Sequence, residues 1–274
     1  MRKLKENILK FFIYSSAFFT VSILFMIVSY IFIKGIGGIN LSYLTSDYLA
    51  DGSGGILPMI ITTLYMVVLS LSIATPIGVL SAIYLQEYAK KGKLVNIIRF
   101  ATESLAGIPS IIYGLFGGIF FVITLKLEYS ILAGALTVSI IILPVIIRTT
   151  EEALKTVPTG YKEASLALGA TKFQTLYKVI LPSAIPGILS GIILSVGRVI
   201  GESAAVLLTA GTVAQMPEGI FSSARTLTVH AYLLTKEKGD IQGAASLGIV
   251  LIVMVFLLNT LAKVIAKRLN KANY

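Results

Sequence analysis

The stretch Phe11–Ile33, FFIYSSAFFTVSILFMIVSYIFI, decides the fold class, because it contains no charged residue over a length that crosses a lipid bilayer. At 1.5 Å per residue, a helix of this length spans about 34 Å. The whole chain has a similar composition: 56% of its 274 residues are hydrophobic and only 13% are charged, against roughly a quarter charged in a soluble domain. The stretch lacks the short apolar core and the small-residue cleavage site of a signal peptide. We therefore predict that it remains as a first transmembrane helix.

Five further apolar stretches predict five more spans. They lie at 56–86, 96–125, 129–148, 182–210 and 244–266. We therefore predict an all-α, polytopic membrane protein with six transmembrane helices. The predicted domains are a first helix with its outer loop (1–55), a transmembrane domain (56–266) that includes a hairpin (149–181), and a tail (267–274).

The basic residues are distributed unevenly between the predicted loops, and this distribution predicts the orientation. Of the 23 lysines and arginines, 17 lie in the N-terminal segment, the tail, the loops 87–95 and 149–181, and the adjoining span ends; 5 lie in the remaining loops, and Arg198 lies inside a span. Basic residues hold short loops on the cytoplasmic side. We therefore predict that both termini and the hairpin are cytoplasmic. The net charge of +10 is then a feature of topology and does not indicate nucleic-acid binding.

Proline and glycine interrupt several of the predicted spans. The interruptions are Pro58, Pro76 with Gly78, Gly107 with Pro109, Pro144, and Pro186 with Gly187. Backbone groups freed inside a membrane must be satisfied by protein or by a watery cavity. Any one of these sites could be a simple packing kink, but several together favour a transporter or channel over a plain anchor.

Glycines also recur at four-residue spacing, which lets helix backbones approach closely. The pairs are Gly114 with Gly118, Gly187 with Gly191, and Gly197 with Gly201. This spacing fits dimerisation or packing within the chain, and six helices in one chain favour the second interpretation.

The loop 149–181 carries the pattern of a helical hairpin. Tyr161–Leu168 forms one short helix, Gly169 supplies a turn, and Thr171 with Gln174 forms a capping box for a second helix. Four apolar residues in that second helix follow the spacing of one helix face: Phe173, Leu176, Tyr177 and Ile180. We expect Pro182 to end it where the next span begins. The alternative is a helix lying on the membrane surface.

The hairpin resembles the EAA signature of ABC-importer permeases, Glu-Ala-Ala, then Gly, then Ile-x-Leu-Pro. The matching residues are Glu163-Ala164-Ser165, Gly169 and Ile180-Leu181-Pro182. The resemblance implies a type I ABC importer (MetI-like) permease fold, in which this hairpin docks into a groove of a cytoplasmic ATPase. It therefore implies coupling roles for Glu163, Ala164, Ser165, Gly169, Leu181 and Pro182. It also implies that Mg-ATP is bound by the ATPase and that this chain is not itself an enzyme.

Two further motifs resemble the phosphate-transporter branch of that family. They are Ala106–Gly117, AGIPSIIYGLFG, and Gly197–Ala204, GRVIGESA. Sequence features that are less specific than these motifs, among them the stretch Thr228–Tyr232, resemble the PstA type of subunit more than its sister PstC. The implied function is a permease subunit that forms half of a phosphate pathway in the cytoplasmic (inner) membrane. The implied partners are a PstC-like permease, a PstB-like ATPase dimer, a PstS-like binding protein and a PhoU-like regulator. A permease for another oxyanion is the alternative within the family.

Arg198 and Glu202 are notable independently of the family resemblance, because a charged side chain inside a membrane span is energetically costly. If the helix continues, their i,i+4 spacing places both side chains on one face, where they can pair. The pair could lock two spans together, or Arg198 could offer its guanidinium to phosphate oxygens. Arg148 is a candidate for phosphate exit or a simple membrane-boundary anchor, and Ser110 in the first phosphate-permease motif completes the predicted pathway set.

Other interpretations use the remaining polar residues. We expect Arg99 and Glu103 to form a boundary pair and His230 to be an ordinary loop residue. An ion-coupled secondary transporter is the alternative from a different class, since broken helices and a buried pair would serve it too. An enzyme is disfavoured because the chain has no cysteine, one histidine, and no P-loop, HExxH or GxSxG motif. No catalytic or metal site is predicted.

Overall fold

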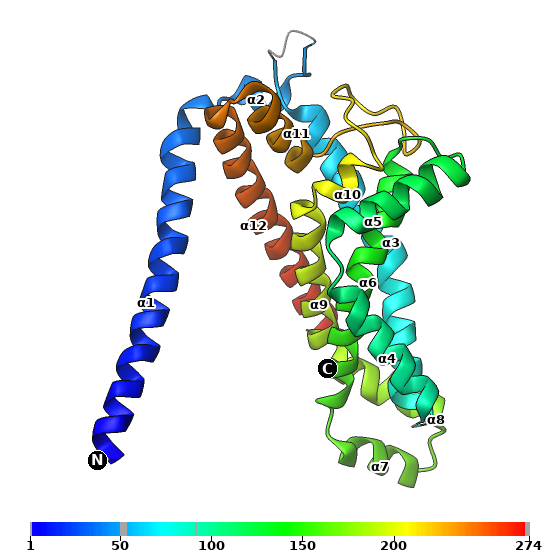
Figure 1. The fold of residues 1–274 in the computed structure, drawn as a ribbon. Helices are drawn as coiled ribbons and strands as arrows, with labels where there is room; N and C mark the ends of the chain where they lie inside the picture. The colour runs from blue at the N-terminus through cyan, green and yellow to red at the C-terminus, as the bar shows by residue number, and fades with distance from the viewer. Residues whose placement is uncertain (1, 50–53, 91, 272–274) are drawn as a thin grey trace.

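The computed structural model describes residues 2–49, 54–90 and 92–271, and within them the chain is helical apart from its turns, its loops and one isolated bridge between Tyr48 and Gly54. Lys91 of the predicted basic loop, and the end of the predicted tail at 272–274, lie outside these residues. The long helices are α1 (Arg2–Gly35), α3 (Leu57–Ile83), α6 (Ile131–Lys155), α9 (Leu181–Gly201) and α12 (Ile241–Lys271). These helices run between two ends of the molecule (Figure 1). We call the end with α7 the hairpin side and the end with α2 and α11 the loop side.

Shorter elements connect the long helices. The α-helical ones are α2 (Leu41–Thr45), α4 (Lys93–Ala106), α5 (Ser110–Gly117), α7 (Thr159–Ala167), α8 (Lys172–Thr175), α10 (Ala204–Leu207) and α11 (Leu227–Leu233). A 3₁₀ turn, η1 (Ile36–Gly38), follows α1. Four segments have π-helical hydrogen bonding: η2 (Tyr84–Tyr88), η3 (Gly118–Thr124), η4 (Leu176–Ile180) and η5 (Leu234–Lys238). Each of these four π segments adjoins an α-helix without a break, so that α3, α5, α9 and α11 each extend beyond their regular part.

Within the part of the chain that the structure describes, five helical segments are long and apolar enough to cross a membrane. They are Glu6–Gly38, Leu57–Tyr88, Ile131–Lys155, Lys172–Gly201 and Ile241–Val264. The remaining predicted span, 96–125, which is the third in chain order, is not one helix. It consists of α4 and the α5–η3 segment, which are bent by 100° relative to each other. The bend occurs at Gly107–Pro109, because proline lacks the N–H that a continuous helix would bond.

The core lies where α3, α6 and α9 pack together. Its most deeply buried apolar residues include Met59, Met66, Val138, Ile142 and Ile200. Glycines allow the close approach. A Cβ on Gly191 of α9 would lie 2.0 Å from the Thr149 Oγ1 of α6. The glycine spacing at Gly187 and Gly191 therefore serves packing within the chain, as the sequence favoured.

Helix α1 stands apart from this core. It meets α12 near the loop side, where Ser246 donates a hydrogen bond to the Gly35 carbonyl at 2.8 Å. From that contact the two helices diverge toward the hairpin side (Figure 1). No residue of its most apolar stretch is buried within this chain. The predicted first span thus forms a helix that touches the rest of the molecule at one end.

The fifth span differs from its prediction at both ends. Pro182 does not end the hairpin's second helix, because α8, η4 and α9 run on as one 30-residue segment, Lys172–Gly201. The π turn of η4 shifts the hydrogen-bonding register just before the proline. At the other end the helix stops at Gly201 and not at Ala210, since Glu202 adopts an extended conformation with φ −77° and ψ 122°.

On the loop side, α11 is hydrogen-bonded to α3 and α9. The Thr63 Oγ1 of α3 accepts a hydrogen bond from the Leu227 N at 3.0 Å, and the Thr228 hydroxyl donates to the Ile200 carbonyl at 2.7 Å. These bonds fasten the segment after α10 to the ends of α3 and α9.

Candidate functional site

The hairpin forms as predicted from the sequence. Gly169 has φ +85°, and the helix α7 ends in two bonds that surround it, from the Ala170 N to the Ser165 carbonyl and from the Gly169 N to the Leu166 carbonyl. This is a Schellman ending, which a glycine accommodates without strain. Both bonds of the predicted capping box are present: the Thr171 N donates to Gln174 at 2.9 Å, and the Gln174 N donates to the Thr171 hydroxyl at 3.2 Å.

The predicted apolar face of the second helix is divided. Leu176 and Ile180 are buried against the spans, whereas Phe173 and Tyr177 are exposed and stack on each other with ring centroids 6.3 Å apart. The prediction of a single stripe is wrong, because each i,i+4 pair keeps one direction but one pair is buried and the other is exposed. One pair holds the hairpin to the membrane domain and the other is left free.

The free face of the hairpin combines aromatic, aliphatic and acidic side chains. Its exposed members, which we call the hairpin surface, are Tyr161, Glu163, Leu168, Phe173 and Tyr177. Leu168 is 89% exposed, which is unusual for a leucine at a well-formed helix end. Glu163 makes no hydrogen bond or ion pair with the part of the chain that the structure describes. A partner with a complementary groove could therefore bind this surface without first breaking a contact of Glu163.

The other residues of the predicted EAA signature lie behind this surface. Ala164 is exposed beside Glu163, while Ser165 is half-buried and its hydroxyl lies 3.0 Å from that of Thr175, joining α7 to α8. Leu181 and Pro182 are partly buried at the base of α9. The signature thus spans the exposed tip of the hairpin and its connection to the fifth span.

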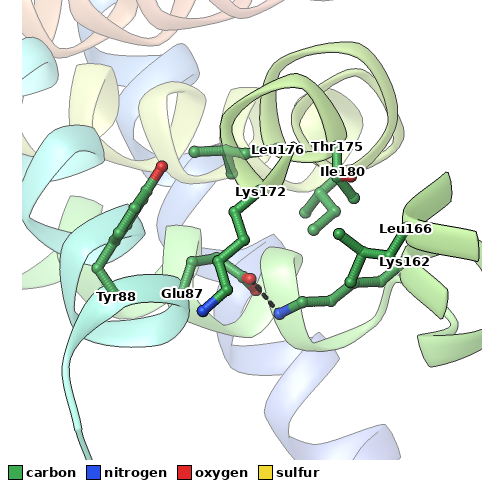
Figure 2. Close-up of a pocket in the computed structure, with 8 residues that line it drawn as sticks. All are labelled: Glu87, Tyr88, Lys162, Leu166, Lys172, Thr175, Leu176 and Ile180. Atoms are coloured by element: carbon green, nitrogen blue, oxygen red, sulfur yellow. Dashed lines mark hydrogen bonds and ion pairs between the residues drawn. The ribbon is translucent and has the colours of Figure 1, made fainter. Parts of the chain in front are cut away.

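A pocket of about 120 Å³ separates the hairpin from the end of α3. Figure 2 shows the Glu87 carboxylate pointing into it from η2 and the Lys162 ammonium reaching it from α7, where the two form an ion pair. Leu166, Leu176 and Ile180 contribute its apolar wall. Glu87 is not among the residues predicted from the sequence, because its only local signal is an acidic side chain at the end of an apolar span.

Arg198 and Glu202 do not form the predicted pair. The i,i+4 rule holds within a continuous helix, but α9 ends at Gly201, between the two residues. Arg198 is exposed and has no ion pair or hydrogen bond among the described residues. Glu202 is only 8% exposed and accepts a hydrogen bond from the Ala205 N at 3.2 Å, at the start of α10. Glu202 therefore has a capping role, and the Arg198 guanidinium is unpaired.

Arg198 lies within electrostatic range of Tyr113, which is near the bend of the third span. Its charge acts on the hydroxyl of Tyr113 in α5, and that hydroxyl donates to the Leu105 carbonyl across the bend at 2.7 Å. Ser110, partly buried, is one helical turn before Tyr113. The sequence did not single out Tyr113, although it lies in the quoted motif.

Arg148 lies nearer the hairpin side. It is exposed and lines a pocket of about 120 Å³ between α4 and α6 that also contains Glu103 and Lys155. The predicted Arg99–Glu103 pair is absent; Arg99 instead pairs with Glu151 of α6 at 3.3 Å. Gly191 packs at the level of Thr149, and seven residues separate Gly191 from Arg198. Arg148 and Arg198 are therefore offset by about 10 Å along the helix axis.

His230 is not an ordinary loop residue. It is 2% exposed within α11, its Nδ1 lies 3.1 Å from the Arg225 Nη1, and its ring packs edge-on against Tyr48. Burial, together with the positive charges of Arg225 and Lys238, lowers the pKa of His230 to about 4. Arg225 also donates to the Thr212 carbonyl at 2.7 Å, so this cluster fixes the loop that follows α10.

No group of three or more histidine, cysteine, aspartate or glutamate side chains that could hold a metal ion occurs within residues 2–49, 54–90 and 92–271. Among the described residues, charged groups of the site form pairs of opposite sign, such as Lys162 with Glu87, or have no partner, as do Glu163 and Arg198. The arrangement can therefore bind an anion, or a partner protein, through arginine and lysine.

Comparison with known proteins identifies close similarity over most of the chain. Residues 74–272 match the family model described as the binding-protein-dependent transport system inner membrane component. A probable ABC transporter permease, YqgI of Bacillus subtilis strain 168, is 36% identical over 260 residues, which cover 88% of each chain. The phosphate transport system permease protein PstA of Pasteurella multocida strain Pm70 is 37% identical over 210 residues, or 76% of this chain and 75% of that one.

Solved structures show a similar fold. A chain of the inward-facing MetNI methionine ABC transporter superposes with a TM-score of 0.60 at 23% identity, covering 78% of this chain and 94% of its own. A chain of a bacterial alginate ABC transporter also gives 0.60, at 16% identity, with 78% and 79% covered. The predicted MetI-like architecture is thereby confirmed.

Proposed function

The chain belongs to the family of binding-protein-dependent transport system inner membrane components, the membrane permease subunits of ABC importers, and we propose that it is the PstA-type subunit of an ATP-driven phosphate importer. The relatives named as phosphate permeases and the two phosphate-permease motifs support this choice of substrate. A PstC-type role, or a permease for another oxyanion, is the alternative within the same family.

The observation that carries the proposal is the hairpin surface. An exposed patch of Tyr161, Leu168, Phe173 and Tyr177 beside an unpaired Glu163 is suited to a groove on another protein, because apolar anchors bind there while a charge fixes orientation. The occupant we propose is a separate ATPase subunit, which binds Mg-ATP. This chain would then be a non-catalytic subunit that receives the movement of the ATPase.

The pathway that we propose differs from the one predicted from the sequence in the role of Glu202. Arg198 has no carboxylate partner among the described residues, so its planar guanidinium is available to bind two phosphate oxygens without displacing Glu202. Ser110 can donate a hydroxyl hydrogen bond near the bend, and Arg148 offers a second cation about 10 Å further toward the hairpin side. Glu202 stays in the proposal only as the residue that ends α9 and holds α10.

The remaining partners follow from the same proposal. The protein is a multi-pass membrane protein, placed here in the cytoplasmic membrane, with the hairpin and both termini facing the cytoplasm. A PstC-like permease would supply the other half of the pathway, a PstB-like dimer the ATPase, a PstS-like protein the captured phosphate, and a PhoU-like protein regulation.

Uptake into vesicles distinguishes this function from an ion-coupled carrier. The tagged chain is purified with its bound subunits, the subunits are identified, and the complex is reconstituted with radiolabelled phosphate outside. We expect uptake only when ATP is hydrolysed by a co-purified ATPase. Uptake driven by an ion gradient, with no ATPase bound, would show that the chain is a secondary transporter.

A further inference from the structure

The hairpin is attached to the membrane domain through its chain ends, through the packing of Leu176 and Ile180 in one cluster with Ile83 of α3, and through one ion pair. Its chain continues from α6 on one side and, through α8 and η4, into α9 on the other. The third attachment is the ion pair between Lys162 of α7 and Glu87, 75 residues earlier at the end of the α3–η2 helix. Within the described residues, no other hydrogen bond or ion pair joins α7 to that helix.

The surroundings of Glu87 favour its ion pair with Lys162. Its side chain is 12% exposed, and its neighbours Leu176 and Ile180 are buried and apolar. A carboxylate in such surroundings is costly without a counter-charge. Lys162 is 42% exposed, so the lysine could reach solvent if the pair separated, but the carboxylate could not. The asymmetry favours the paired position of α7.

The position of Glu87 determines what the pair would transmit. The α3–η2 helix packs along α6 in the core that also includes α9. Packing of Leu176 and Ile180 in one cluster with Ile83 already links η4 to α3. The ion pair adds a direct link from α7, so that a displacement of α7 would move α3 as well as α9. The Ser165–Thr175 contact keeps α7 and α8 together as one body.

We propose that Glu87 and Lys162 are positioning residues that carry displacement of the docked hairpin into α3, so that ATPase movement reaches the second span as well as the fifth. This inference rests on the proposed function, since it requires an ATPase on the hairpin surface. Neither residue contacts the substrate. Their effect is on the number of phosphate ions moved per ATP hydrolysed.

The test uses the reconstituted four-component complex with ATP and labelled phosphate. Glu87→Met and Lys162→Met should each lower phosphate uptake per ATP hydrolysed by roughly 2- to 30-fold, the range expected for residues along a coupling route. The ATPase should remain bound and hydrolyse ATP. Lys172→Met is the matched control, because Lys172 lines the same pocket without an ion pair (Figure 2); it should retain the wild-type ratio. An equal loss of uptake per ATP hydrolysed in Lys172→Met would overturn the role proposed for the Glu87–Lys162 pair.

Two double variants separate coupling from stability. Glu87→Met with Lys162→Met leaves no orphaned charge and should assemble, yet remain uncoupled; wild-type coupling in it would overturn the proposal. Glu87→Lys with Lys162→Glu rebuilds the pair in reverse and should recover most of the ratio, and failure to recover while the complex assembles would count against it. If the wild-type complex itself shows no ATP-dependent uptake, it is the proposed function that fails.

Discussion

Replacing Gly191 with alanine tests the packing that leaves the Arg198 face of α9 free. The added Cβ would lie 2.0 Å from the Thr149 Oγ1 and 2.7 Å from the Thr149 Cβ, far inside ordinary contact. Thr149 is held in place, because its hydroxyl donates to the Val145 carbonyl at 2.8 Å and approaches the Ile146 carbonyl at 3.2 Å. Helices α9 and α6 must therefore separate, and such overpacking costs about 1 to 3 kcal/mol.

Gly197→Ala is the matched control on the same helix. A Cβ there meets nothing within 4 Å, and both variants gain the same helix propensity of about 1 kcal/mol. The difference between them therefore isolates the clash, about 1 to 3 kcal/mol. At about 2 to 4 °C per kcal/mol for a chain of this size, Gly191→Ala should melt roughly 2 to 12 °C below Gly197→Ala.

The assay is the melting temperature of the isolated, detergent-solubilised chain, followed by size exclusion of a fluorescent-tagged sample because the chain has no tryptophan. Adding Thr149→Ala to Gly191→Ala should recover part of the loss. Equal melting temperatures for the two glycine variants would refute the packing of α9 on α6.

The remaining predictions concern pH, docking and the pathway. His230 has a pKa of about 4 in the folded chain against about 6.5 when unfolded, so it contributes up to about 3 kcal/mol to the free energy of unfolding above pH 6.5, and this contribution is lost as the pH falls toward 4. The melting temperature should therefore fall more between pH 7.5 and pH 4.5 in the wild type than in His230→Gln. Glu163→Lys and Gly169→Pro should abolish uptake while membrane insertion persists, since proline cannot adopt φ +85°; normal co-purification of the ATPase with normal uptake would contradict docking at the hairpin. Arg198→Gln should cut uptake about tenfold or more with ATP hydrolysis retained, and undiminished uptake would exclude Arg198 from the pathway.

Much of the fold could be predicted because it depends on local properties of the chain. Apolar runs such as Phe11–Ile33 identify spans without knowledge of their neighbours, and the hairpin follows from a glycine turn and a capping box. The interruption of the third span at Gly107 and Pro109 was predicted, but its 100° bend was not, because residue types alone do not give the angle between two helical segments. The end of α9 was missed for a similar reason, since nothing in the residues around Glu202 excludes a helix.

The candidate site was less predictable because its partners are distant in sequence. The Arg198–Glu202 pair was inferred from spacing that holds only in an unbroken helix, and it fails when the helix ends at Gly201. Glu87 forms an ion pair with Lys162, which lies 75 residues later in the sequence. His230 is buried by the packing of α11 against Tyr48, which no local pattern reports. The roles of the EAA residues and of the pathway cations stay predictions.

The most direct test of the account is the uptake of labelled phosphate by the reconstituted complex, with and without ATP, against excess unlabelled phosphate, sulfate or molybdate. The account predicts ATP-dependent uptake that unlabelled phosphate abolishes and that sulfate and molybdate leave nearly unchanged. Equal competition by sulfate, or transport of sulfate with phosphate excluded, would contradict the assignment of this chain to phosphate import.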